Sequence, residues 1–128
     1  IQKTSKKNSR IGILSTEATL NTKIYHKYFQ KSFDLLSPSK ILQKSSVNKS
    51  IKFVKMGKIR EAEKAIRPAV NYLIKINCKK IILGCTELPI AIFAYKSFKK
   101  IKESKIFVDP NLLIANVSMK KYKKLKKQ

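Results

Sequence analysis

The chain is poor in cysteine, in acidic residues and in long apolar runs. Of its 128 residues two are cysteines and seven are acidic, and no apolar run approaches the ~18 residues of a membrane span. Cys78 and Cys85 are expected at opposite ends of one strand, about 20 Å apart at ~3.3 Å per residue, whereas a disulfide needs Cα atoms within ~7 Å. With no signal peptide expected, these features favour two reduced thiols and a cytoplasmic protein over a disulfide-rich secreted domain.

The shortage of acidic residues leaves a net charge of +23. Such a charge is typical of proteins that bind nucleic acid or anionic membranes. However, lysine outnumbers arginine 27 to 3, and arginine is the residue that recognises phosphate or guanine through two parallel hydrogen bonds. The lysine excess is typical of an AT-rich genome, and the dense run at 120–127 is typical of a solvated helix end. We therefore expect no specific nucleic-acid partner and no membrane, although the positive field would attract a dianionic amino acid.

Apolar runs alternate with helical periodicities along the chain, which predicts an α/β fold: a parallel sheet flanked by helices. Residues 1–10 are polar and predict a linker. Strands are expected at residues 11–15, 33–36, 78–84 and 105–108. Helices are expected after a Thr19 cap, over a stretch that includes 47–54 and ends at Gly57, over 59–76 with a kink at Pro68, over 87–95, and from Pro110 onward.

The most informative segment is residues 81–85, Ile-Ile-Leu-Gly-Cys. Three apolar residues predict a buried parallel strand, and Gly84 would allow a sharp turn where it ends. Cys85 is then at the carboxyl end of a strand, the edge where open α/β sheets bind ligands. The free N–H groups of the next helix would lower the thiol pKa from ~8.5, making Cys85 a usable acid or base. A buried structural cysteine is the alternative.

Four segments resemble motifs of the aspartate/glutamate racemase family. Residues 84–89, Gly-Cys-Thr-Glu-Leu-Pro, are similar to its second-cysteine motif, and residues 11–19 to the strand that ends in Ala-Thr-x-Gly-Thr. Residues 54–57 resemble its Val-Lys-x-Gly, and residues 107–110 its closing Ile-Asp-Pro. Two positions depart from the pattern, because Ser15 and Ala18 stand where the family more often has Ala and Gly. Glu87 indicates the aspartate-racemase-like branch, since glutamate racemases usually have His there.

The resemblance implies one lobe of a two-lobe fold, because 128 residues suffice for one domain with its own core but not for two. Residues 1–10 would be a linker and 11–110 the C-terminal α/β lobe. Residues 111–128 would form a C-terminal helix with a basic tail that packs on a missing N-terminal lobe. That lobe would carry the first cysteine, in a Cys-Asn-Thr motif, and would be a partner of this chain; a second copy of the chain, in a homodimer, is a further candidate partner.

The resemblance also implies a reaction: racemisation of a small acidic amino acid by proton transfer at Cα between two cysteines, with no cofactor and no metal. Removing a proton from one face and returning it to the other requires two groups that flank the carbon. Cys85 would be one of them, assisted by Glu87, while Cys78 would be structural. The substrate-binding residues would be Lys55, Thr86, Thr16 and Thr19.

Structural alternatives exist for these side chains: helix caps for Thr19 and Thr86, a first-turn acid for Glu87 and a solvated charge for Lys55. Three functions stay open. The first is an aspartate or glutamate racemase that works only with the missing lobe. The second is another chemistry of the superfamily, such as hydantoin racemisation, maleate isomerisation or malonate decarboxylation. The third is a noncatalytic remnant that binds an anion or a partner.

Overall fold

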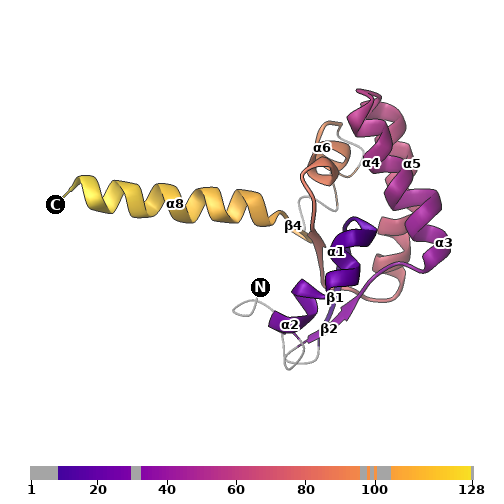
Figure 1. Cartoon of the computed structure of the whole chain (residues 1–128), viewed down its shortest axis with the longest axis horizontal. Helices are drawn as coiled ribbons and strands as arrows, with labels where there is room; N and C mark the ends of the chain where they lie inside the picture. The colour runs from indigo at the N-terminus through magenta and orange to yellow at the C-terminus, as the bar shows by residue number, and fades with distance from the viewer. Residues whose placement is uncertain (1–8, 30–32, 96–97, 99, 101–104, 128) are drawn as a thin grey trace.

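A computed structural model describes residues 9–29, 33–95, 98, 100 and 105–127. Within these residues, four parallel strands form one sheet in the order β2-β1-β3-β4 (Figure 1). The strands are β1 (Ser9–Leu14), β2 (Phe33–Leu36), β3 (Lys80–Leu83) and β4 (Phe107–Val108). The chain runs from β1 outward to β2 and then returns to the other side of β1 to form β3. The strand order therefore reverses between β1 and β3, the topological switch point at which open α/β sheets bind ligands.

Helices cover both faces of this sheet, so the expected α/β fold is confirmed. The segments are α1 (Glu17–Thr22), α2 (Ile24–Phe29), α3 (Lys40–Leu42), the π-helix η1 (Gln43–Asn48), α4 (Lys49–Lys55), α5 (Ile59–Lys75), α6 (Glu87–Phe93) and α8 (Pro110–Lys126). On one face Leu14, Ile81 and Leu83 pack against α4, α5 and α6. On the other, Ile13 and Ile82 pack against Leu20 and Tyr25 of α1 and α2.

The first helical region differs from the expectation. Thr16 rather than Thr19 caps α1: its hydroxyl accepts a hydrogen bond from the Thr19 amide at 3.2 Å. The helix then stops at Lys23, whose backbone is left-handed with φ 53°, so one expected helix is two short ones. In addition, β1 begins at Ser9, within the segment expected to be a linker; residues 1–8 are outside the described part of the chain.

The two cysteines are free, as expected. Cys78 is buried and precedes β3, and its amide donates to the Leu73 carbonyl at 3.0 Å. Burial raises the pKa of the Cys78 thiol, an effect that Arg10 partly offsets. Cys78 therefore has the surroundings of a structural residue.

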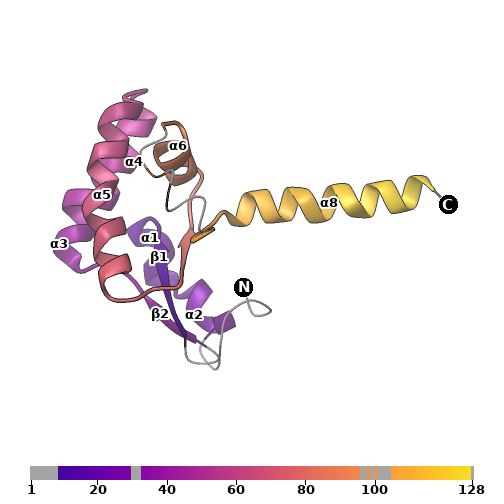
Figure 2. The same cartoon turned by 180° about the vertical axis from the view of Figure 1, so that it is seen from behind.

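Helix α8 projects away from the rest of the protein (Figures 1 and 2). Pro110 begins it, as the sequence predicts, Asp109 caps it, and none of its residues is buried. Its exposed large apolar side chains are Leu112, Leu113, Ile114, Val117, Met119, Tyr122 and Leu125. Among the helices that the structure describes, neither α8 nor any other is long and apolar enough to cross a membrane.

Candidate functional site

The site is built where β1 and β3 end side by side. The Gly84 amide donates to the Leu14 carbonyl at 2.7 Å, and the buried Ser15 hydroxyl donates to the Gly84 carbonyl at 3.2 Å. A Cβ on Gly84 would lie 3.0 Å from both the Cβ and the Oγ of Ser15. Glycine is needed here for this close approach. The turn expected at Gly84 uses no left-handed backbone angle, since the positive φ among the described glycines is that of Gly57.

Cys85 follows directly and lies at the N-terminal end of α6, as the sequence predicts. Thr86 occupies the N-cap position but makes no side-chain capping bond. The backbone N–H groups of Glu87 and Leu88 donate instead to the Cys85 sulfur. The thiol therefore satisfies helix donors that would otherwise have no partner.

The expected lowering of the Cys85 pKa is wrong. Burial of the half-buried thiol raises its pKa, and this outweighs the opposing effect of the Leu88 and Glu87 amides. The Glu87 carboxylate raises the pKa further, both through its charge and by accepting a hydrogen bond from the thiol. In this structure Cys85 is therefore a protonated thiol at neutral pH, which suits a proton donor.

Glu87 and Thr86 are linked to each other as well as to the cysteine. The Thr86 hydroxyl donates to Glu87 Oε2 at 3.2 Å. Thr86 is exposed, and Glu87 is partly exposed in the first turn of α6. The structure thus brings both predicted residues to Cys85, with Glu87 in direct contact with the thiol.

A cavity of about 620 Å³ opens beside this edge. Gly84 and Thr19 are both in its wall, whereas Cys85, Thr86 and Glu87 do not line it. The Thr16 hydroxyl donates a hydrogen bond to Thr19 Oγ1 at 3.0 Å and so orients the Thr19 side chain. Tyr25 also lines the cavity, and burial, then the negative charge that Cys85 carries once it is ionised, raise the pKa of its phenol. Its hydroxyl therefore stays available as a hydrogen-bond donor.

Lys55 is not brought to this cavity. It is exposed in the last turn of α4, a helix that packs against α6. Within the described part of the chain no hydrogen bond or ion pair joins its side chain to another residue. Its role in binding a substrate stays a prediction.

Three residues at this edge were not predicted as site residues from the sequence: Ser15, Tyr25 and Gln43. Gln43 is buried in η1 and its Nε2 donates to the Ser15 carbonyl at 2.8 Å. In the sequence, Ser15 is marked only by its departure from the family pattern. Gln43 could not be predicted, because its partner Ser15 lies 28 positions earlier in the chain and no local pattern shows this contact. Across the described residues no three His, Cys, Asp or Glu side chains gather into a metal site.

The chain is similar to known racemases. A family model described as Asp/Glu/Hydantoin racemase matches residues 1–116. The glutamate racemase of Carboxydothermus hydrogenoformans is 28% identical over 126 residues, which are 98% of this chain and 44% of that protein. A protein of Pectobacterium carotovorum subsp. carotovorum described as "Uncharacterized protein in pnlA 3'region" is 35% identical over 85 residues, 66% of this chain and 56% of that one.

A solved racemase structure also has a fold similar to that of this chain. The aspartate racemase of Picrophilus torridus superposes with a TM-score of 0.64 at 28% sequence identity, over 84% of this chain and 42% of that one. The chain thus spans about half the length of the relatives it matches.

Proposed function

Because the chain belongs to the aspartate, glutamate and hydantoin racemase family, we propose that it supplies one of the two proton-transfer groups of an amino-acid racemase. The observation that carries the proposal is the position of Cys85, a half-buried thiol at the switch point of the sheet, bound by the first amides of α6. A structural cysteine requires neither that position nor a carboxylate in contact with the thiol.

In the proposed reaction Cys85 exchanges a proton with the Cα atom of the substrate. With its thiol protonated, Cys85 gives a proton to one face of the carbanion while a thiolate on the opposite face has taken the original proton. The two sulfurs exchange protonation states in each turnover, so the next conversion runs in the opposite sense. Glu87 contacts the thiol and holds its proton until the carbanion forms, because its negative charge opposes formation of a second anion beside it.

The substrate that fits this edge is aspartate or glutamate. Hydrogen-bond donors for the α-carboxylate would come from Thr86, Thr16 and Thr19, at the ends of β1 and β3. The Thr16 and Thr86 hydroxyls must first turn away from Thr19 Oγ1 and Glu87 Oε2, to which they donate in this structure. Lys55 would neutralise the side-chain carboxylate, which requires its ammonium group to reach from the end of α4 toward α6. The net charge of +23 favours encounter with a dianion.

The opposite proton-transfer group is proposed to come from a second lobe. Residues 11–110 would be the C-terminal lobe, and the related glutamate racemase and aspartate racemase are each about twice as long as this chain. Helix α8 supports this proposal, because the large apolar side chains of its first half, Leu112, Leu113, Ile114 and Val117, are exposed, and a contiguous exposed apolar surface is typical of a protein–protein contact. We propose that α8 packs on that lobe.

The first experiment incubates the 128-residue chain with L-aspartate and measures D-aspartate by chiral chromatography. We expect no racemisation, because one thiol serves only one face of Cα. Racemisation that is lost in Cys85→Ala would show that a second lobe is not needed.

The second experiment uses a protein in which this chain is preceded by the second lobe. We expect Cys85→Ser to lose nearly all racemisation in both directions, because a hydroxyl is too weak an acid to shuttle the proton. Solvent exchange at Cα through the opposite cysteine is expected to survive for one enantiomer, which separates loss of one group from loss of the fold. Near-normal racemisation by Cys85→Ser would contradict the mechanism.

Lys55 is tested in the same protein by its kinetics. We expect Lys55→Met to raise KM and lower kcat/KM roughly 10- to 100-fold, the value of a charge-assisted contact of about 1.5–3 kcal/mol. Lys52→Met is the matched control, since Lys52 is exposed on the same helix. Equal effects of the two substitutions would show that only the general positive field matters.

A further inference from the structure

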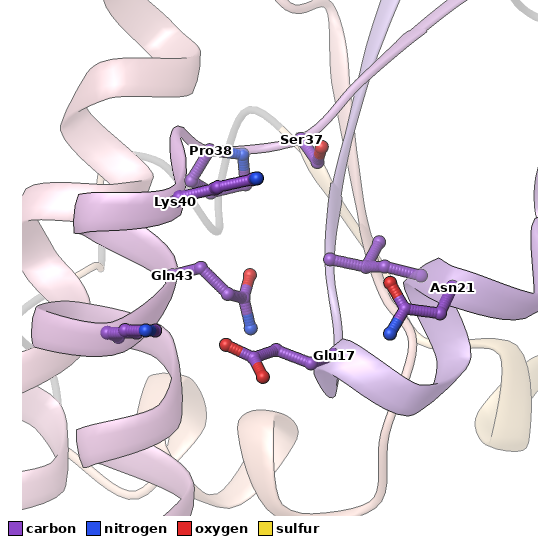
Figure 3. Close-up of a pocket in the computed structure, with 8 residues that line it drawn as sticks. Glu17, Asn21, Ser37, Pro38, Lys40 and Gln43 are labelled. Carbon is purple, nitrogen blue, oxygen red and sulfur yellow. The ribbon is translucent and has the colours of Figure 1, made fainter.

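A second cavity lies at the same edge of the sheet, on the other side of α1. It has a volume of about 420 Å³ and is enclosed by α1, the residues that follow β2, and the α3–η1 segment (Figure 3). Its polar wall residues are Glu17, Asn21, Ser37, Lys40, Gln43 and Lys44. None of its lining residues lines the cavity beside Gly84, so it is a separate space.

Gln43 supplies an acceptor without a partner in this cavity. The residue is 4% exposed, and its Oε1 atom makes no hydrogen bond. Figure 3 shows this oxygen directed into the space below Lys40, while Glu17 approaches the amide from the opposite side. A buried acceptor without a donor is costly, so native proteins rarely leave one empty.

The orientation of the Gln43 amide is fixed by its neighbours. Its Nε2 donates to the Ser15 carbonyl at 2.8 Å and to Asn48 Oδ1 at 2.9 Å. Asn48 in turn donates from Nδ2 to Glu17 Oε1 at 3.1 Å. A backbone carbonyl and a carboxylate can only accept, so neither amide can be rotated by 180° without losing these bonds. The free atom is therefore an oxygen, and it requires a donor.

Charges of both signs line this cavity. The Glu17 carboxylate is on one side, and Lys40 reaches over the cavity from the other (Figure 3). Lys44 is also in the wall, and within the described residues neither lysine is in an ion pair. A ligand that satisfies all of these groups carries an N–H donor with positive charge and, a short distance away, a negative charge.

We propose that this cavity binds a free amino acid as its zwitterion. The ammonium group donates to Gln43 Oε1 and pairs with Glu17, while the α-carboxylate is held by Lys40. The Asn21 amide can bind either group. A volume of about 420 Å³ is within the range of small-molecule pockets and leaves room for the amino-acid side chain.

The test titrates the chain with glycine and follows the side-chain amide signal of Gln43 by NMR. Acetate and methylammonium are the comparison probes, because each carries half of the zwitterion. We expect glycine to shift the Gln43 signal and to bind at least tenfold more tightly than either half. If glycine leaves the signal unmoved, the cavity holds water only and the proposal is wrong.

Substitutions of exposed residues test the charges in the cavity without disturbing the fold. Glu17→Gln removes the charge but keeps an acceptor for Asn48, and Lys40→Gln removes the opposite charge. We expect each to weaken glycine binding about five- to tenfold, as loss of a partly exposed charged contact does. Lys52→Gln on α4 is the control and is expected to leave it unchanged. Equal affinities in all three variants would show that glycine binds elsewhere.

Discussion

Two opposing effects act on the pKa of the Cys85 thiol. The amides at the start of α6 favour the thiolate, whereas burial and the Glu87 carboxylate favour the thiol, and burial is the largest effect. The sequence shows the helix start but does not show how deeply the sulfur lies beneath neighbouring residues. This is why the position of the cysteine could be predicted and the direction of its pKa shift could not.

Replacing Glu87 with glutamine isolates the contribution of its charge. We expect Glu87→Gln to lower the Cys85 pKa, because a neutral amide no longer repels the thiolate. Reaction of Cys85 with iodoacetamide at pH 8 is then expected to become about two- to tenfold faster, measured by peptide mass spectrometry with the buried Cys78 as an internal reference. Glu61→Gln, exposed on α5, is the control. A slower reaction of Glu87→Gln would mean that Glu87 acts as a base toward the thiol.

Gly84 is required by contact with Ser15 rather than by backbone conformation. We expect Gly84→Ala to destabilise the protein by about 1–3 kcal/mol, because the new Cβ would lie 3.0 Å from Ser15 atoms. Adding Ser15→Gly is expected to recover much of this loss in urea denaturation. Gly57→Ala provides the contrast: its cost comes from φ +74° with open space around it, so Ser15→Gly is not expected to relieve it.

At the scale of elements, hydrogen bonds of the Ser46 side chain join η1 to α5 next to Pro68. The Ser46 hydroxyl of η1 donates to the Ala65 carbonyl and accepts from the Ala69 amide at 3.1 Å. These are the two groups that pair directly in an uninterrupted helix. A proline in a helix removes one such bond and crowds the preceding turn, and Ser46 supplies bonds beside it. The helix thus continues through Pro68 from Ile59 to Lys75.

These hydrogen bonds predict that the effects of substituting Ser46 and Pro68 on the free energy of unfolding are coupled. We expect Ser46→Ala to cost about 1–3 kcal/mol, because it leaves buried backbone groups without the hydroxyl. In a Pro68→Ala background the helix can close these bonds itself, so the cost of Ser46→Ala is expected to fall by more than about 0.5 kcal/mol. Ser50 is the matched control, since it is buried and donates to Ala62 at 2.7 Å, away from the proline. Additive effects of Ser46→Ala and Pro68→Ala would contradict the coupling.

The sequence predicts most helices and strands, but it does not predict the points at which a helix is broken or changes its type. Helices α5 and α8 follow apolar periodicity or a Pro at the helix start, and β2 and β3 follow apolar runs, so all four lie where they are expected. The break at Lys23 could not be predicted, because lysine has no preference for a left-handed backbone. The Ser46 hydroxyl bonds to backbone groups of Ala65 and Ala69, 19 and 23 positions further along the chain, and no local pattern predicts such pairing.

At the scale of the whole molecule, the apolar side chains of α8 are not expected to contribute to the stability of this chain by itself. No residue of α8 is buried, so we expect Leu113→Ser and Val117→Ser to change the free energy of unfolding of this chain by less than about 0.5 kcal/mol each. Leu73→Ala in the core is the contrast, with an expected loss of about 2–5 kcal/mol. Urea denaturation of the three variants measures this difference.

The same α8 substitutions give the opposite expectation when the second lobe is present. If α8 packs on that lobe, Leu113→Ser and Val117→Ser lose buried apolar contacts and destabilise the longer protein. Unchanged stability of the longer protein would contradict the proposed packing, whereas a loss confined to it would locate the interface on α8.

The contact between Ser15 and Gly84 also sets the order in which the two cavities can form. Gln43 reaches Ser15 across 28 positions of the chain, whereas Ser15 reaches Gly84 across 69. Loop-closure cost grows as (3/2)RT ln n, so the longer closure costs about 0.8 kcal/mol more. During synthesis the segments around Gln43 are complete well before β3 is made. A nascent chain therefore has no cysteine edge until Leu83 has left the ribosome and paired with β1, and the thiol reaches its half-buried state only after β3 has joined the sheet.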